Sequence, residues 1–301
     1  MNPRIITPRA NEWPPQLNEL APDAPRKLYA AGLPLDLGRR SIAVVGSRRP
    51  TAAGIEAAQR LTHGLAEAGF AIVSGLAVGI DTVAHHTALE AGSYTVAVLG
   101  CGLDVNYPQR NASLRNRIAE CGTLVTEYEP TTQPIAHNFP RRNRIIAGLV
   151  TAVLFVEGGA TSGGRITARL ALDANRNVYA VPGSIRNPMA SGPNELIRTS
   201  QALLVTDVAH IFDDLASDLD FSDAHAAPLP VRPDVVLTDI EEAILAYLDD
   251  VPSPVDAVAI DIDVPVGDVG LALSGLELRG LASRHPAGYY ISGRGARVRT
   301  G

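Results

Sequence analysis

Several features that often mark a secreted protein or a metalloprotein are scarce in this 301-residue chain. It has two cysteines, Cys101 and Cys121, and neither stands at metal-ligand spacing from another ligand residue. We therefore expect no metal site, and we expect both cysteines to be reduced core residues, as in a cytoplasmic protein. No apolar run is long enough for a signal peptide or a membrane span, so we expect a soluble protein in the cytoplasm with no membrane partner.

Signatures of cofactor binding and catalysis are also missing. The chain has no Gly-x-Gly-x-x-Gly dinucleotide pattern and no Gly-Lys-Ser/Thr phosphate loop, so we expect no NAD, ATP or other cofactor. It has no Gly-x-Ser-x-Gly elbow and no histidine pair at metalloprotease spacing. These absences predict a protein that is not an enzyme and has no catalytic residues.

Lysine is almost absent, and arginine supplies nearly all of the positive charge. Residues 1–206 hold 20 basic and 15 acidic residues, whereas residues 207–301 hold 6 basic and 17 acidic residues. The overall charge of −6 therefore combines a positive N-terminal part (+5) with a strongly negative C-terminal part (−11). Clustered arginines create local fields that attract polyanions. Such clusters occur at Arg39, Arg40, Arg48 and Arg49, at Arg141, Arg142 and Arg144, and at Arg165 and Arg169.

Short apolar runs alternate with helical patterns after residue 40. The runs predict strands at 42–46, 70–74, 95–99, 123–126, 152–156 and 178–181, with helices at 54–67, 82–90, 113–119, 142–147 and 164–174. Buried strands joined by helices are typical of a parallel sheet covered on both faces. We therefore expect an α/β fold with a Rossmann-like parallel-sheet core over residues 41–220. The proline-rich residues 1–40 predict an irregular N-terminal arm packed on this core.

A small C-terminal domain is expected beyond a linker at 221–233 that is rich in alanine, proline and aspartate. Predicted helices at 239–248, 255–260 and 266–278 and a hairpin at 283–292 indicate a winged-helix domain over residues 234–295. The third helix of such a domain often reads DNA. Here it carries Asp268 and Glu277 and no basic residue before Arg279, so we expect this domain to have a protein-contact or packing role and not to read bases.

Ligands of a parallel sheet bind where strands end and helices begin. The loop Gly46-Ser47-Arg48-Arg49 offers a small-residue turn and two guanidinium groups to a phosphate, and the glycine-rich loop at 158–165 offers backbone amides. The loop at 74–81 is interpreted as a tight turn in which Asp81 caps the next helix. His85 and His86 follow it, and we interpret them as packing or hydrogen-bonding residues.

A further loop, at 137–144, places Phe139 among Arg141, Arg142 and Arg144. Single-stranded nucleic acid requires this combination, because bases stack on a ring while cations follow the backbone. The alternative is that Phe139 belongs to the core and that the arginines form a solvated surface. These residues by themselves favour neither alternative.

Taken together, these loops resemble one family. Residues 13–215 resemble the DNA-processing protein A (DprA/Smf) family, and residues 237–292 resemble its winged-helix domain. The motifs that carry the resemblance are Val45-Gly46-Ser47-Arg48, Ser74-Gly75-Leu76-Ala77-Val78-Gly79-Ile80-Asp81, Val98-Leu99-Gly100-Cys101-Gly102-Leu103-Asp104 with Tyr107-Pro108, Asn138-Phe139-Pro140-Arg141-Arg142-Asn143-Arg144, Ser162-Gly163 and Val181-Pro182-Gly183-Ser184.

The resemblance implies a protein that binds single-stranded DNA without sequence preference, forms a homodimer and loads a RecA-type recombinase during DNA uptake, transformation and recombination. It implies that dimer and recombinase contacts fall around residues 196–215. By similarity, the DNA pocket is lined by Gly46, Ser47, Arg48, Phe139, Arg142, Asn143, Arg144 and Ser162, and we add Gly163 and Arg165 of the glycine-rich loop as DNA-binding candidates.

Two other functions stay open. One is a nucleotide-processing hydrolase of a related Rossmann-like fold, but such enzymes carry Pro-Gly-Gly-x-Gly-Thr followed by a glutamate. Here Glu157 precedes the glycines, and Arg165-Ile166-Thr167 follows them. The other is a structural scaffold for DNA uptake, which would bind protein and not DNA.

Overall fold

The computed structural model describes residues 3–37, 40–215, 237–248, 253–278, 282–285 and 288–291. The chain divides into two compact units, residues 1–229 and 230–301. Each unit has its own hydrophobic core. The predicted linker at 221–233 lies outside the described residues, so its bounds stay a prediction.

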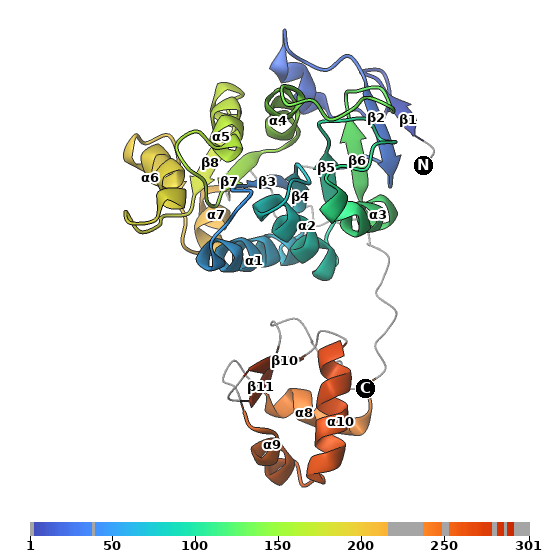
Figure 1. Ribbon diagram of the computed structural model, residues 1–301, viewed down its shortest axis with the longest axis vertical. Coiled ribbons are helices and arrows are strands. Elements are labelled where there is room, and N and C mark those ends of the chain that lie inside the picture. The colour runs from blue at the N-terminus through green and yellow to red at the C-terminus, as the bar shows by residue number, and fades with distance from the viewer. Residues whose placement is uncertain are drawn as a thin grey trace. The chain divides into compact units, whose positions relative to one another are not determined.

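A nine-stranded sheet with the order β1-β2-β6-β5-β4-β3-β7-β8-β9 forms the first unit (Figure 1). All neighbouring pairs from β6 to β9 in this order are parallel. The strands are β3 (Ser41–Val45), β4 (Ala71–Ser74), β5 (Thr95–Val98), β6 (Thr123–Thr126), β7 (Ala152–Phe155), β8 (Asn177–Ala180) and β9 (Leu203–Leu204). The expected α/β class and parallel core are confirmed, and each predicted strand lies within one residue of its observed bounds.

The N-terminal segment is more regular than its proline content predicts. Strand β2 (Leu28–Gly32) pairs antiparallel with β6, and β1 (Arg4–Ile6) pairs antiparallel with β2, so both extend the sheet. Between them lies the 3-10 helix η1 (Pro15–Leu20), which contacts α4 (Asn138–Leu149). The prediction of an irregular arm is therefore wrong for these elements. Strands as short as these depend on long-range pairing, of β2 with β6 and of β1 with β2, which no local sequence pattern reveals.

Helices cover both faces of the sheet (Figure 1). One face packs against α1 (Ala52–Glu67), α2 (Ile80–Glu90) and α7 (Val208–Leu215), with α3 (Ala112–Cys121) beside them, and the other packs against α4 and α5 (Gly163–Asp173). Ile42 and Val44 of β3 face the first layer and Ala43 and Val45 face the second, because side chains alternate along a strand. Helix α6 (Ser191–Arg198) follows β8. In the described part of the chain, no helix combines the length and apolar character that crossing a bilayer requires.

Helix α4 begins earlier than predicted. The sequence predicts a loop up to residue 144 with a short helix from 142, but the helix runs from Asn138 to Leu149. Pro140 lies in its first turn, where the missing N–H has no helical carbonyl to bond. Phe139 and the three arginines that follow it are therefore helical residues, and their directions follow helical periodicity.

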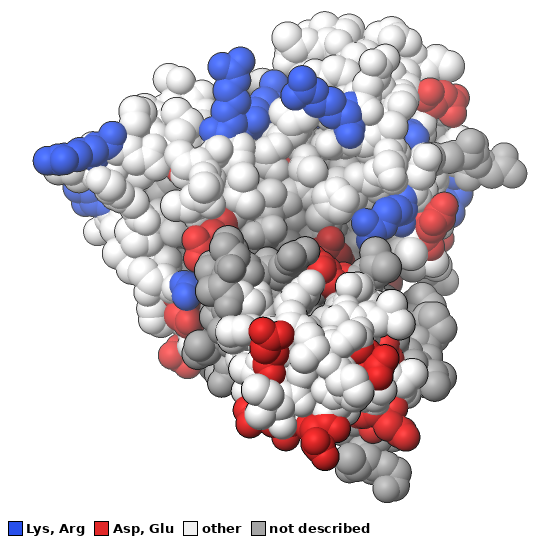
Figure 2. All heavy atoms as spheres, turned by 60° about the horizontal axis from the view of Figure 1, so that its bottom comes forward, with Lys and Arg blue, Asp and Glu red and all other residues white. Residues whose placement is uncertain are grey.

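The second unit contains α8 (Asp239–Tyr247), α9 (Val255–Asp261), α10 (Val266–Leu278) and the antiparallel strands β10 (Ala282–His285) and β11 (Gly288–Ile291). A capping box between Thr238 and Glu241 begins α8. Three helices followed by a hairpin agree with the predicted winged helix, although residues 286 and 287 of the hairpin lie outside the described residues. Acidic side chains gather on this unit (Figure 2).

His85 is fully buried in α2, and its Nδ1 lies 2.8 Å from Oγ1 of Thr95. The Thr95 hydroxyl donates its proton to the carbonyl of Ile72, so it accepts a hydrogen bond from Nδ1–H of the imidazole. Nε2 is then unprotonated, and it is buried without a hydrogen-bond partner. Burial, with smaller contributions from His86 and Arg142, lowers the pKa of His85 to about 3. This geometry confirms the interpretation of His85 as a packing and hydrogen-bonding residue.

Because His85 is neutral in the folded core, we expect the free energy of unfolding to fall in acid. The pKa of His85 is about 3 in the folded chain and has an ordinary value of 6.5, so between these values the unfolded chain binds more protons. Its contribution to stability is complete above pH 6.5 and falls with decreasing pH, by up to about 1.4 kcal/mol per pH unit. His85→Asn, which does not titrate, should lose free energy of unfolding less steeply below pH 6.5, as measured by urea unfolding. Equal slopes for the two proteins would contradict this assignment.

Candidate nucleic-acid interface

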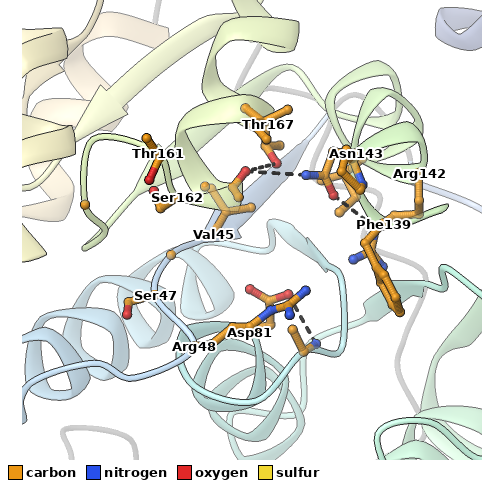
Figure 3. A pocket seen from close by; sticks show the side chains of 18 of the residues that line it. Val45, Ser47, Arg48, Asp81, Phe139, Arg142, Asn143, Thr161, Ser162 and Thr167 are labelled. Atoms are coloured by element: carbon orange, nitrogen blue, oxygen red, sulfur yellow. Dashed lines mark hydrogen bonds between the residues drawn. The ribbon is translucent and has the colours of Figure 1, made fainter. Parts of the chain in front are cut away.

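A cavity of about 740 Å³ opens at the carboxyl end of the parallel strands. It lies beside β3 and β7, which are neighbours in the sheet. The sheet continues from β3 through β4 and β5 on one side and from β7 through β8 on the other, so the strand order reverses between β3 and β7. Such a reversal leaves a crevice because the loops after the two strands lead to opposite faces of the sheet. Three segments form its walls, namely the loop after β3, the glycine-rich loop after β7 and one side of α4 (Figure 3).

The loop after β3 contributes Gly46, Ser47 and Arg48. A Cβ on Gly46 would lie 2.6 Å from Cγ1 of Ile80, so only glycine fits this close packing. The Ser47 hydroxyl accepts a hydrogen bond from the Arg49 amide at 3.0 Å and donates one to the sulfur of Met189 at 3.6 Å. Arg48 is exposed, so its guanidinium is available to a ligand.

A buried carboxylate fixes this loop from behind. Glu157 accepts hydrogen bonds from the backbone N–H of Thr51 at 2.8 Å, from the Thr51 hydroxyl at 2.7 Å and from the side-chain amide of Asn187 at 2.9 Å. Thr51 in turn caps α1. Glu157 does not line the cavity, and its two oxygens are used in holding loops together. Glu157 is the closest candidate for the glutamate of a hydrolase, and these contacts give it a structural role.

The glycine-rich loop leads into the N-terminus of α5 and lines the cavity with Thr161, Ser162 and Gly163. The Ser162 hydroxyl caps the helix by accepting from the Arg165 amide at 3.4 Å. The first amides of a helix lack helical partners and point toward the positive end of its dipole, which favours an anion. This wall can therefore hold a phosphate without a charged side chain.

Helical periodicity decides which residues of α4 face the cavity. Phe139, Arg142, Asn143 and Ile146 recur on one side of the helix, and all four line the cavity. Arg144 lies on another side, where its Nη2 pairs with Oε2 of Glu127 at 2.6 Å. The expectation that Arg144 lines the pocket is therefore not met.

The other predicted residues also divide into those that line the cavity and those that do not. Arg165 also lies outside the cavity lining, and its guanidinium donates to the carbonyl of Ala160 at 2.7 Å. The cavity brings together eight of the ten predicted positions, which are Gly46, Ser47, Arg48, Phe139, Arg142, Asn143, Ser162 and Gly163. Their contact with DNA stays a prediction.

Arg142 lines the cavity but is almost completely buried. Its Nη1 donates to the carbonyl of Gly75 at 2.9 Å and to the carbonyl of Val98, and its Nε donates to Oδ1 of Asn143 at 3.1 Å. Burial lowers the pKa of Arg142 to about 10, against the opposing attraction of Asp81. Arg142 therefore joins the loops after β4 and β5 to α4.

Asp81 lies beside this arginine, and its role differs from the predicted helix cap. Gly79 occupies the N-cap position of α2, and the Asp81 carboxylate instead accepts from the amides of Gly75 at 3.1 Å and Ala77 at 3.3 Å. Burial raises the pKa of Asp81, and the nearby Arg142 opposes that shift. The carboxylate therefore stabilises the turn that precedes its own helix.

We expect Arg142→Met to lower the free energy of unfolding by about 3 kcal/mol, because it leaves buried carbonyls and the Asp81 carboxylate without their guanidinium partner. The neighbouring Arg141→Met is the matched control, since the Arg141 side chain is 64% exposed, and it should change stability by less than about 0.5 kcal/mol. Urea unfolding followed by circular dichroism measures both values. Equal stability of the two variants would show that Arg142 is not structural.

Phe139 is half-buried and forms the aromatic part of the cavity. The Arg48 guanidinium carbon lies 5.6 Å from the centre of its ring, within cation–π range. Figure 3 shows the Arg48 side chain reaching toward Phe139. A Cβ on Gly100 would lie 2.7 Å from the ring, so glycine is required beneath it. Phe139 is thus neither sealed in the core nor fully solvated, so it is not the core residue of the second alternative, and its contact with nucleic acid stays a prediction.

Tyr107 is a cavity residue that the sequence analysis did not select. Its ring centre lies 5.4 Å from that of Phe139 at an interplanar angle of 41°, and the residue is 38% exposed. The two rings make one aromatic wall. The only sequence signal was the Tyr107-Pro108 pair within a motif of the family resemblance, and Met189 and Thr161 had no comparable signal.

The cavity offers two rings, one exposed guanidinium and a helix N-terminus. No group of three histidine, cysteine, aspartate or glutamate side chains with the arrangement of a metal site occurs among the described residues. The arrangement suits a ligand that has both flat rings and negative charge.

The chain is similar to known proteins. The family model described as DNA recombination-mediator protein A matches residues 4–216, and the model described as DprA winged helix domain matches residues 226–288. Protein Smf of Escherichia coli is 39% identical over 99% of this chain and 80% of its own length. DNA processing protein DprA of Streptococcus pneumoniae is 42% identical over 64% of this chain and 68% of its own length.

Solved structures also resemble the chain. The X-ray structure of DNA processing protein A from Streptococcus pneumoniae superposes with a TM-score of 0.67 and 38% identity, covering 73% of this chain and 75% of that chain. DNA processing protein A from Helicobacter pylori, described for its single-stranded DNA binding mode, superposes with a TM-score of 0.65 and 30% identity, covering 71% of this chain and 97% of that chain.

Proposed function

Because the chain belongs to the DNA-processing protein A (DprA/Smf) family, we propose that it binds single-stranded DNA in the cavity described above and passes it to a RecA-type recombinase. The observation that carries the proposal is the pairing of the exposed Arg48 with the Phe139 ring in an open crevice. The Helicobacter pylori relative, which is described for its single-stranded DNA binding mode, supports it.

The proposed binding is independent of base sequence. Every base has a π face that can stack on Phe139 or Tyr107, and neither ring reads hydrogen-bonding groups on a base edge. Phosphates would lie at Arg48 and at the N-terminus of α5, which recognise charge and not sequence. A duplex buries the faces of its bases in its own stack, so an unpaired strand is favoured over a duplex.

The role that we propose is non-enzymatic. Glu157 is occupied in holding Thr51 and Asn187, and Asp81 is occupied with the amides of Gly75 and Ala77. Neither carboxylate is arranged to activate a water on a ligand in the cavity. These contacts give the hydrolase alternative no support.

The salt dependence of DNA binding distinguishes the phosphate contact of Arg48 from the stacking contact of Phe139. Arg48→Ala should weaken binding to every single strand about equally and reduce the slope of log K against log salt by about 0.7, because one phosphate contact is lost. Phe139→Ala should cost roughly 1–3 kcal/mol with an unchanged slope, because stacking releases no counterion. Fluorescence anisotropy with labelled poly-dT, with duplex as competitor, measures both effects.

Arg141→Ala is the matched control, because this arginine is exposed on a side of α4 that does not line the cavity. Arg144→Ala tests the role that the family resemblance implied, and we expect it to bind nearly as well as the parent. If Arg48→Ala and Phe139→Ala bound poly-dT like the parent, the cavity would not be the DNA site. If the parent failed to bind poly-dT, the scaffold alternative would be favoured.

We extend the proposal to a homodimer that uses β9. This strand ends the sheet, and its Leu203 and Leu204 are 51% and 48% exposed. An open sheet edge that carries apolar side chains favours pairing with another chain. Two copies would present two cavities to one strand, which raises the effective affinity for long DNA.

Leu203→Asp combined with Leu204→Asp should convert the dimer to a monomer, because charge on the edge opposes burial against a second copy. Ile5→Asp is the control, since Ile5 is also exposed but lies on β1 at the opposite end of the sheet. Light scattering after size exclusion gives the molar mass of each protein. A dimer that survives the double substitution would exclude β9 as the contact.

The recombinase step and the cellular setting complete the proposal. RecA on DNA coated with single-strand-binding protein should begin ATP hydrolysis sooner when the parent protein is added, and the Phe139→Ala variant should not shorten this lag. A cytoplasmic setting agrees with two unpaired cysteines. Cys101 is buried as expected, whereas Cys121 is exposed, so the prediction of a core position is wrong for Cys121. Uptake of DNA and transformation are the processes in which we expect this activity to be used.

A further inference from the structure

The segment between β8 and α6, residues 181–190, borders the cavity, and the site described above gives it no contact with a ligand. It follows the carboxyl end of β8, the strand next to β7, so it lies at the same edge of the sheet as the cavity. Its Met189 lines the cavity and accepts the hydrogen bond from Ser47. Ser47 and Phe139 lie on different sides of the cavity in Figure 3, so this segment borders the end away from the aromatic wall.

Hydrogen bonds hold both ends of the segment. At one end, Gly183 exchanges two hydrogen bonds with the side chain of Asn194, at 3.1 and 2.8 Å. At the other end, Asn187 donates to Glu157 at 2.9 Å, and the carbonyl of Met189 accepts from the amide of Gly158 at 2.6 Å. The amide of Asn187 also bonds to the carbonyl of Ser184 at 2.9 Å, which closes a turn. The tip between Ser184 and Asn187 is therefore held in place by polar contacts.

This tip presents Ile185 and Arg186 to solvent. Ile185 is 97% exposed, and Arg186 is exposed beside it. A single exposed isoleucine is ordinary on a protein surface. Here, however, it stands on a tethered turn, next to a cation and beside a cavity whose opposite side also pairs an apolar group with an arginine, Phe139 with Arg48.

We propose that this tip is a second contact for the same single strand, which leaves the cavity past Met189 and crosses residues 184–187. Ile185 packs against a base or sugar, as apolar side chains do in other nucleic-acid complexes, and Arg186 lies near a phosphate. This inference rests on the proposed function. It adds that the site extends beyond the cavity, so that affinity depends on the length of the strand.

An oligonucleotide length series tests the extension. The double variant Ile185→Ser with Arg186→Ala should bind dT of about 25 nucleotides roughly tenfold more weakly than the parent, and should bind dT of about 6 nucleotides within about twofold. Arg186→Ala alone should reduce the salt slope for the long strand by about 0.7 and leave that for the short strand unchanged. The matched control is Ile5→Ser with Arg9→Ala, two exposed residues near β1, and it should bind both strands like the parent.

Other results of this length series would contradict either the second contact or the proposed function. If the double variant bound the long strand like the parent, or lost affinity for both strands equally, the second contact would be excluded. If the parent bound neither strand, the proposed function itself would fail, independently of residues 184–187. The double variant could keep the parent's dependence of affinity on strand length and lose binding to a protein partner. That result would assign the tip to the partner and would overturn the proposal.

Discussion

The guanidinium of Arg142 is the contact on which the geometry of the cavity depends. It is buried where the loop after β4, the end of β5 and α4 meet, and it donates to Gly75 and Val98 at once. A Cβ on Gly75 would lie 2.5 Å from Nη2 of Arg142, so the glycine and the arginine require each other. A buried cation is costly unless it is paired and hydrogen-bonded, and these carbonyls and the adjacent Asp81 meet that requirement.

The consequence of this arrangement is a rigid frame around a few free groups. Arg142 and Glu157 fix two walls from behind, and the cap at Ser162 fixes the third. Arg48, Phe139 and Tyr107 are left partly exposed at the front. Binding groups that are already oriented lose little entropy when a ligand arrives, which favours affinity from a small number of contacts.

Charge is distributed so that the cavity can attract a polyanion in a protein whose net charge is −6. The acidic surplus lies after residue 206, and acidic side chains gather on the C-terminal unit (Figure 2). Helix α10 exposes Asp268 and Glu277 at the position from which a winged helix usually reads DNA. Negative charge there disfavours contact with phosphate, which agrees with our expectation that this helix does not read DNA.

Local pattern in the sequence determined the α/β class, the six predicted strands of the core and the helices that follow them, because buried parallel strands leave clear signals. Together with the family resemblance, it also selected eight residues that line the cavity. Tertiary structure alone decided the pairing of β2 with β6 and of β1 with β2, since these contacts join segments far apart in the chain. It also decided the roles of the arginines after Phe139. Once Pro140 was accommodated in the first turn of α4, helical periodicity turned Arg142 into the interior and Arg144 toward Glu127. Tyr107 reached Phe139 only through the folding of the loop after β5, so its place in the aromatic wall depended on packing and not on spacing.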